Sequence, residues 1–160
     1  MTWTTPKTWN TGDPLTAGDM NTHIRDNLNV LKAPATALVT KVFASDYILT
    51  TSGWADIDPA FSLTLDTTGG DVLVGFNISA GNASGGVSGY NLRVDGVDVS
   101  TETYGILKVD SPGSHALHYT WLVRPLAAGT HTFKLRWRTF SGYSGMVGGA
   151  LNQFWAREVS

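Results

Sequence analysis

Apolar and polar residues alternate through most of the chain beyond its first quarter. The segment 132–138 is the clearest case, with three apolar side chains on one face and three basic side chains on the other. Segments 72–78 and 115–124 alternate in the same way, and Asp95-Gly96 stands between two further runs as a strong hairpin signal. This spacing predicts about eight to ten short strands, typical of a sandwich. We therefore expect a mainly β fold, an antiparallel jelly-roll β-sandwich, over residues 35–160.

A different period precedes the strands and predicts one short α-helix over residues 16–32. Thr16 is suited to cap the start of this helix, and Pro34 ends it. The apolar positions form a narrow seam with spacings of four, four and three: Met20, Ile24, Leu28 and Leu31. Such a short seam is not stable alone. We expect it to pack against copies of itself, or against the larger domain.

Residues 1–15 read as an extended arm in front of the helix. Trp3, Pro6 and Trp9 recur at every third residue, which places them on one face of a polyproline-type conformation. Tryptophans on so short an arm favour a partner surface. We expect the arm to dock on another subunit or another protein, and the alternative is that it packs on its own domain. The predicted organisation is thus an anchoring segment, 1–34, followed by a β domain, 35–160.

The final strand, predicted near 149–158, is apolar on both faces. Phe154 and Trp155 are neighbours and therefore point to opposite sides of the sheet. One face can meet the core of the sandwich, and the other needs a second cover. We expect Trp155 to lie in a subunit interface, with a tryptophan half-covered by the protein's own loop as the alternative.

Composition favours an assembly and argues against several other classes. Charged residues make up only 15% of the chain, whereas 42% are hydrophobic, which suggests surface hidden between subunits. The net charge of −2 argues against a nucleic-acid partner. No cysteine is present for disulfides or thiolate metal sites. Neither a signal peptide nor a membrane-spanning apolar run is seen, so we expect a chain made in soluble form, without export through a signal peptide and without membrane insertion.

The sequence offers little catalytic chemistry, and we expect no enzyme and no catalytic, cofactor-binding or metal site. The four histidines do not have the spacing of zinc ligands. Asp56 and Asp58 share one side of a strand and could serve a glycosidase, but Pro59 follows them and favours a strand end. Residues 142–145 resemble a nucleophile elbow without its spacing.

Two segments rich in small residues around a tyrosine, 81–90 and 141–149, have the composition of adaptable binding loops. The candidate receptor residues in them are Asn82, Tyr90 and Tyr143, and ordinary flexible turns are the alternative. Separately, the basic side of 132–138 could meet an anionic glycan or a capsid. The alternative for that stripe is the solvated face of an edge strand.

Two parts of the chain resemble proteins of tailed bacteriophages. Residues 8–17, TWNTGDPLTA, followed by residues 20–32, MNTHIRDNLNVLK, resemble the N-terminal segment that recurs in phage and prophage virion proteins. Residues 129–137, GTHTFKLRW, and 154–158, FWARE, resemble the trimeric tumour-necrosis-factor-like and complement-type jelly rolls of fibre tips. The resemblance implies an anchor at the N-terminus, through Trp3, Pro6 and Trp9, and a display domain behind it.

The function implied by this resemblance is that of a structural virion protein on the virion surface, a short trimeric fibre or spike. Its expected partners are two further copies of itself, other virion proteins, and a host surface glycan or protein to which it would adsorb. The expected trimer contacts are Met20, Ile24, Leu28, Leu31 and Trp155. Two alternatives remain open: a capsid decoration or cement protein without a receptor role, and a carbohydrate-binding module.

Overall fold

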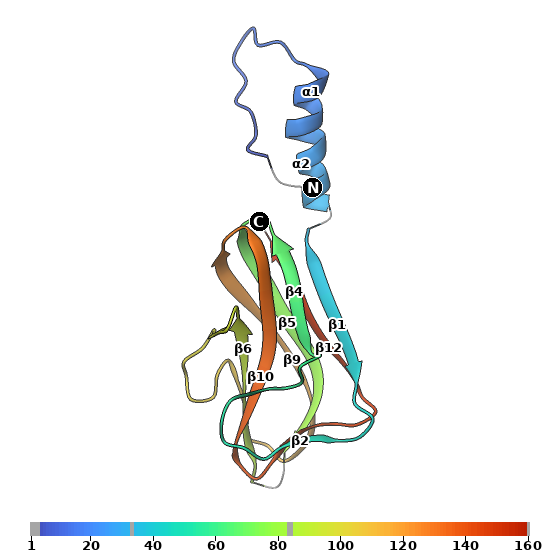
Figure 1. The fold of residues 1–160 in the computed structure, drawn as a ribbon, viewed down its shortest axis with the longest axis vertical. Helices are drawn as coiled ribbons and strands as arrows, with labels where there is room; N and C mark the ends of the chain where they lie inside the picture. Colours follow the sequence, from blue (N-terminus) through green and yellow to red (C-terminus); the bar gives the residue numbers. More distant parts are fainter. Residues whose placement is uncertain (1–3, 33, 83–84, 160) are drawn as a thin grey trace. The chain divides into compact units, whose positions relative to one another are not determined.

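The computed structural model describes residues 4–32, 34–82 and 85–159, with the side chains of 30–32 left aside. The chain divides into two compact units, Met1–Ala35 and Thr36–Ser160, one residue away from the expected boundary. Strands account for 56% of the chain and helix for 9%, which confirms the mainly β class with one short helix. Figure 1 shows the two units in sequence colours, with the helix in blue.

Two antiparallel sheets build the second unit. Sheet A follows the order β1-β12-β5, with β9 on the other side of β5, and β11 and β2 beside the end of β5. Its strands are β1 (Thr36–Val42), β2 (Tyr47–Leu49), β5 (Gly70–Asn82), β9 (Gly113–Leu126), β11 (Ser144–Met146) and β12 (Leu151–Val159). In sheet B, β10 lies between β6 on one side and β3 and β4 on the other, and β7 and β8 pair with β6. Its strands are β3 (Ala55–Asp56), β4 (Ser62–Thr67), β6 (Val87–Val94), β7 (Val97–Asp98), β8 (Leu107–Val109) and β10 (Gly129–Ser141).

The order of the strands is that of a jelly roll. Successive long strands change sheet each time, so that β4, β6 and β10 lie in sheet B and β5, β9 and β12 in sheet A. The resulting orders, β1-β12-β5-β9 and β4-β10-β6-β8, form two facing four-stranded layers. Figure 1 shows β10 and β4 in front of β5 and β9. The predicted antiparallel jelly-roll sandwich is confirmed.

The predicted period-two faces meet in the core between the sheets. On β10, Phe133, Leu135 and Trp137 are at most 1% exposed. The alternating residues of β5 face them from sheet A, and Phe154 of β12 is fully buried. Trp137 stacks on Tyr47 of the opposite sheet, with ring centroids 5.7 Å apart. The apolar side of β9 is only half-buried, because this strand forms the edge of its sheet.

The predicted hairpin at Asp95-Gly96 is confirmed. These two residues join β6 to β7, with φ values of 48° and 84°. Two left-handed residues in a two-residue loop form the turn that suits twisted antiparallel strands. The Asp95 carboxylate accepts a hydrogen bond from the backbone N–H of Thr132 at 2.8 Å, which ties the turn to β10.

The first unit is a helix with a chain segment folded along it. The helix is continuous from Ala17 to Lys32, as α1 (Ala17–Met20), a π-helical turn η1 (Asn21–Asp26) and α2 (Asn27–Lys32). Thr16 caps it as predicted: its hydroxyl accepts a hydrogen bond from the Asp19 N–H at 3.1 Å. The π-helical turn was not predicted. It inserts a wider turn among the apolar positions of the seam.

Candidate functional site

The arm contacts the helix of its own unit. Asn27 is 4% exposed, and its side chain accepts from the Thr4 N–H at 2.9 Å and donates to the Thr4 carbonyl at 2.7 Å. His23 is hydrogen-bonded to the carbonyl of Thr5 at 3.1 Å. The two bonds hold both backbone groups of Thr4, which fixes the direction of the arm at this residue. Part of the arm is therefore bonded within its own unit, and its docking on another subunit or another protein stays a prediction.

Among the expected anchoring residues, Trp3 lies outside the described part of the chain. Pro6 is exposed, and Trp9 is 37% exposed with the Lys7 ammonium 4.4 Å from its ring. Pro6 and Trp9 therefore remain accessible to a partner. Lys7 also lies 3.4 Å from the Asp19 carboxylate, which links the arm to the first turn of the helix.

The helix seam is uncovered within its unit. Met20, Ile24 and Leu28 are 38%, 41% and 58% exposed, so that the arm does not shield them. Leu31 lies in α2, and its side chain is not among those described. Three large apolar side chains on one narrow strip remain available for contact with another surface.

The outer face of sheet A carries an apolar patch around Trp155. Leu38 lies directly opposite Trp155 across the β1–β12 ladder, and Val42 lies opposite Leu151. Leu38, Val42 and Leu151 are 59%, 51% and 62% exposed. These four residues, Leu38, Val42, Leu151 and Trp155, are called the outer patch below. Trp155 itself is half-buried, because its indole ring lies over the backbone of Gly75 on β5.

The structure corrects two of the three candidate receptor residues. Tyr90 lies within β6 and is 1% exposed, where it faces Trp137 across the ladder. Burial raises the pKa of its phenol well above the usual range. Asn82 ends β5 and is 6% exposed, with its amide donating to the Val109 carbonyl at 3.0 Å. Both side chains are buried, although Asn82 is also among the residues that line the hollow described next. Tyr143 is 44% exposed in the turn between β10 and β11.

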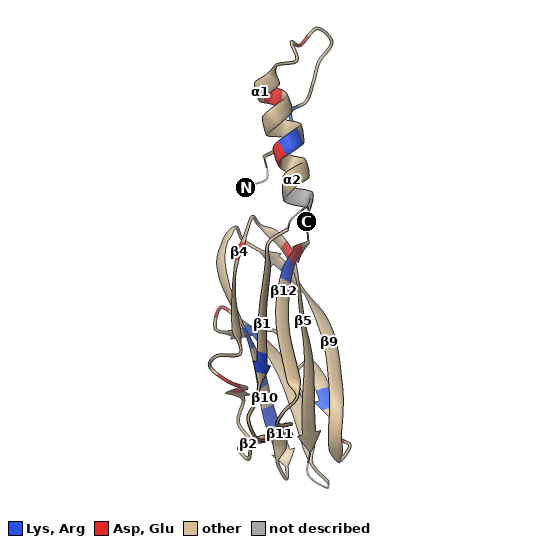
Figure 2. Ribbon diagram, turned by 90° about the vertical axis from the view of Figure 1, so that its right-hand side faces the viewer, with Lys and Arg blue, Asp and Glu red and all other residues tan. Residues whose placement is uncertain are grey.

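Tyr143 borders a hollow on the outer face of sheet A. Its floor is formed by four residues that are neighbours across β2, β11, β5 and β9. In this order they are Ile48, Gly145, Gly81 and Ser114. Asp46 and Tyr143 stand at its rim, and the cavity volume is about 130 Å³. Figure 2 shows β2 and β11, which provide one side of the hollow, at one end of the sandwich. The two candidate segments, 81–90 and 141–149, contain Gly81, Tyr143 and Gly145, but only the strand register shows that the two glycines are partners.

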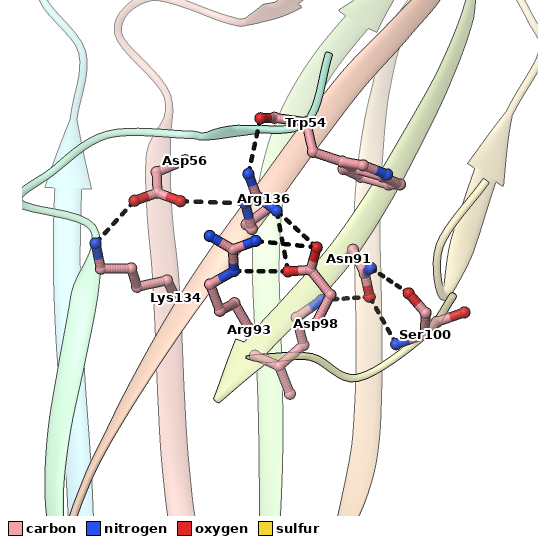
Figure 3. A network of polar contacts seen from close by, with 9 residues as sticks. Trp54, Asp56, Asn91, Arg93, Asp98, Ser100, Lys134 and Arg136 are labelled. Carbon is pink, nitrogen blue, oxygen red and sulfur yellow. Dashed lines mark hydrogen bonds and ion pairs between the residues drawn. The ribbon is translucent and has the colours of Figure 1, made fainter. Parts of the chain in front are cut away.

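Two of the three basic residues of β10, Lys134 and Arg136, are paired with carboxylates, whereas the Arg138 guanidinium lies over the Phe140 ring, 4.2 Å from its centroid. β10 is a central strand, and Arg136 is only 8% exposed. Its Nη1 donates to the Asp98 carboxylate at 2.7 Å, and Lys134 donates to Asp56 at 2.8 Å. Figure 3 shows Arg93 joining the same Asp98 carboxylate, with a distance of 2.8 Å from its Nε. This network stabilises the outer face of sheet B and engages the charges of Lys134 and Arg136.

The two aspartates considered for glycoside hydrolysis are engaged separately. Asp56 pairs with Lys134 and Arg136, at 2.8 Å and 3.2 Å, whereas Asp58 pairs with Lys41 at 2.7 Å. Burial raises the pKa of Asp58, but hydrogen bonds from Lys41 and the Ala60 N–H outweigh it and lower the pKa overall. A general acid needs a raised pKa. The lowered pKa of Asp58 does not suit this carboxyl group to that role.

His131 and Asp95 form an ion pair next to the hairpin, and it makes stability depend on pH. His131 Nδ1 lies 2.6 Å from Asp95 Oδ2, and Nε2 lies 2.9 Å from the Ala127 carbonyl. The bond to Asp95 and then the bond to Ala127 raise the pKa of His131, and the same bond lowers the pKa of Asp95. The stabilisation from His131 is complete below its unfolded pKa of about 6.5 and is lost as the pH rises through the folded value. The contribution of Asp95 is lost as the pH falls through its lowered pKa.

We expect an NMR titration of the imidazole to place the pKa of His131 above that of an unstructured histidine. In Asp95→Asn the pKa of His131 should fall. The substitution removes the negative charge beside the imidazole, whereas asparagine is similar in size to aspartate and suits the same turn position. His118, whose Nδ1 is bonded to the uncharged Asn77 side chain at 2.8 Å, is the internal control and should not respond. An unchanged His131 pKa in Asp95→Asn would contradict the assignment of this pair.

Within the described ranges, no three histidine or acidic side chains gather as metal ligands do. No helix among those described residues is long and apolar enough to cross a membrane. Compared with known proteins, the chain matches no protein-family model and no curated protein sequence.

Proposed function

We propose that the chain is a structural virion protein of a tailed bacteriophage, a short homotrimeric fibre or spike displayed on the particle. In this proposal the jelly roll, Thr36–Ser160, forms the trimer and is displayed. The unit Met1–Ala35 attaches the trimer to other virion proteins. A role in adsorption to the host surface follows if the displayed domain binds a receptor, and a capsid decoration protein is the alternative without one.

The outer patch is the observation that carries this proposal. It joins three more than half-exposed aliphatic side chains to a tryptophan on the outer face of a single sheet. β1 is also the outermost strand of sheet A, so among the described strands β12 is its only neighbour in the ladder. An exposed apolar edge is an aggregation hazard in a free monomer. A second copy of the chain covers such a surface without a further partner, and the resemblance to trimeric jelly rolls favours three copies.

The helix seam supports the attachment role of the first unit. Met20, Ile24 and Leu28 are exposed on a helix that is too short to be stable in water by itself. In a trimer, three such helices can bring their seams together next to the exposed Trp9 and Pro6. The arm would then present those two residues to a neighbouring virion protein.

The proposal is tested by charging the outer patch. Leu38→Lys with Leu151→Lys places two ammonium groups per chain on a surface that the proposal buries. Burying unpaired charges costs several kcal/mol per ion, so we expect the trimer to dissociate. Sedimentation velocity should show the mass falling to that of one chain, 17.1 kDa, while circular dichroism still shows a folded sandwich.

The matched control is Val97→Lys, at a 71% exposed position of β7 in sheet B. It adds one ammonium group per chain, half the charge of the double variant, outside the outer patch and should leave the trimer intact. If the double variant still sediments with the mass of a trimer, the outer patch is not a subunit interface and the proposal loses its principal support.

A further inference from the structure

Two glycines form the floor of the hollow on sheet A, and the fold itself does not require them. Glycine inside a strand weakens it relative to alanine, so a structural reason is normally visible. At Gly75 the reason is plain, since an added Cβ would lie 2.3 Å from the Trp155 ring. At Gly89, in β6, it would lie 2.8 Å from the carbonyl oxygen of Tyr104.

No such reason is visible at Gly81 and Gly145. An added Cβ would find its nearest neighbours at 3.4 Å and 3.5 Å, which are ordinary contact distances. Neither residue has the left-handed backbone that favours glycine. Yet the two are direct partners across the β5–β11 ladder. Paired glycines without a steric or conformational cause mark a place where something outside the chain approaches the backbone closely.

The rim of the hollow offers polar groups with unused bonding capacity. The Asp46 carboxylate is held in place because its Oδ1 accepts from the Gly148 N–H at 2.7 Å. Among the described residues, no partner is seen for Asp46 Oδ2 or for the hydroxyls of Ser114 and Tyr143. An acceptor and two hydroxyls surround a glycine floor, with the side chain of Ile48 at one end. Tyrosine adds a rigid aromatic surface that loses little entropy on binding.

Size and charge restrict the ligand. The volume of about 130 Å³ is below the roughly 300–1,000 Å³ of common cofactor and drug sites, so it suits one small ring. The lining contains an aspartate and no lysine or arginine, which disfavours anionic ligands. A molecule with many hydroxyls and one apolar ring face matches these groups.

We infer that the hollow binds a neutral monosaccharide unit of a surface glycan. The sugar ring lies on the Gly81–Gly145 floor. Its hydroxyls donate hydrogen bonds to the Asp46 carboxylate and both donate to and accept from the Ser114 hydroxyl. The Tyr143 ring lies along one edge of the sugar. This inference rests on the proposed adsorption role, whose receptor class it names. Binding at one such shallow site is weak, and three sites on a trimer raise the effective affinity for a multivalent glycan.

The test is an NMR titration of the full-length protein with separate neutral sugars: D-glucose, D-galactose, L-rhamnose and N-acetyl-D-glucosamine. D-glucuronic acid and N-acetylneuraminic acid serve as anionic probes. We expect at least one neutral sugar to shift the amide signals of Gly81, Ser114 and Gly145 with a millimolar dissociation constant. The anionic sugars should bind at least tenfold more weakly.

Gly81→Ala with Gly145→Ala should weaken the neutral sugar at least tenfold, because the two methyl groups occupy the floor. The control is Gly53→Ala, where an added Cβ meets nothing within 4 Å, and it should bind as the unmodified chain does. The inference is overturned if no neutral sugar shifts these signals, or if the filled floor binds equally well. A trimer without sugar binding would refute this inference alone, whereas a monomer that binds sugar through these glycines would refute the trimeric fibre alone.

Discussion

Trp137→Ala is expected to lower the free energy of unfolding of the sandwich by about 3–5 kcal/mol, the usual cost of truncating a buried aromatic side chain. Trp137 is 1% exposed at the centre of β10. It stacks on Tyr47, which in turn stacks on Phe43 with centroids 5.4 Å apart. These partners come from the sheet A side of the sandwich. Removing the indole ring would therefore leave a cavity between the two sheets, which the surrounding strands cannot easily fill.

Guanidinium denaturation followed by circular dichroism measures this loss. Protein concentration has to be fixed, because folding is coupled to assembly in the proposed trimer. Val97→Ala removes apolar atoms from a 71% exposed side chain and should change the free energy by less than about 0.5 kcal/mol. A loss below about 1 kcal/mol for Trp137→Ala would contradict the placement of this ring between the sheets.

Asp98→Ala should have the second largest effect, about 2–3 kcal/mol. The Asp98 carboxylate accepts hydrogen bonds from both Arg93 and Arg136, and the Arg136 side chain is only 9% exposed. Breaking a fully buried pair costs about 3–5 kcal/mol. The loss here is smaller because Asp98 is 23% exposed and Asp56 remains beside Arg136. Asp98→Asn should lose less, since an amide oxygen can still accept one of these bonds.

The control for Asp98 is Asp110→Ala, which removes an exposed pair with Lys108 and should leave stability unchanged. The contribution of Asp98 should also depend on pH. Burial raises its pKa, but the two arginines outweigh burial and lower it. The stabilisation is therefore present above the unfolded value of about 3.9 and is lost as the pH falls through the lowered one. Equal stability of Asp98→Ala and the unmodified chain would show that the network does not stabilise the sheet.

The fold was predictable because the core residues follow the alternation of apolar and polar positions along single strands. Strict alternation in 132–138 placed Phe133, Leu135 and Trp137 inward, and Asp95-Gly96 located the hairpin. Segment 87–94 gave no such signal, since both faces of β6 are largely buried. Its small residues and tyrosine therefore resembled a binding loop. That is why Tyr90 was wrongly placed among the candidate receptor residues.

The candidate sites depend on strand register, which no local pattern specifies. Arg136 meets Asp56 because β3 pairs with β10, and it meets Asp98 because β7 pairs with β6, the neighbour of β10 on the other side. Gly81 and Gly145 lie far apart in the chain and become neighbours through the β5–β11 ladder. The bonds between Asn27 and Thr4 likewise join the arm to the helix across a turn. Sequence periodicity identified the helix seam and Trp155, but it indicated neither the other residues of the outer patch nor which polar groups converge.

The central claim is that three copies of this chain assemble through the jelly roll. Sedimentation equilibrium of the full-length protein at micromolar concentration tests it most directly. The expected mass is about 51 kDa, three times the 17.1 kDa of one chain. The melting temperature of the same samples should rise with protein concentration, since assembly stabilises the folded chain. A mass of 17.1 kDa, with a melting temperature independent of concentration, would contradict the trimeric fibre.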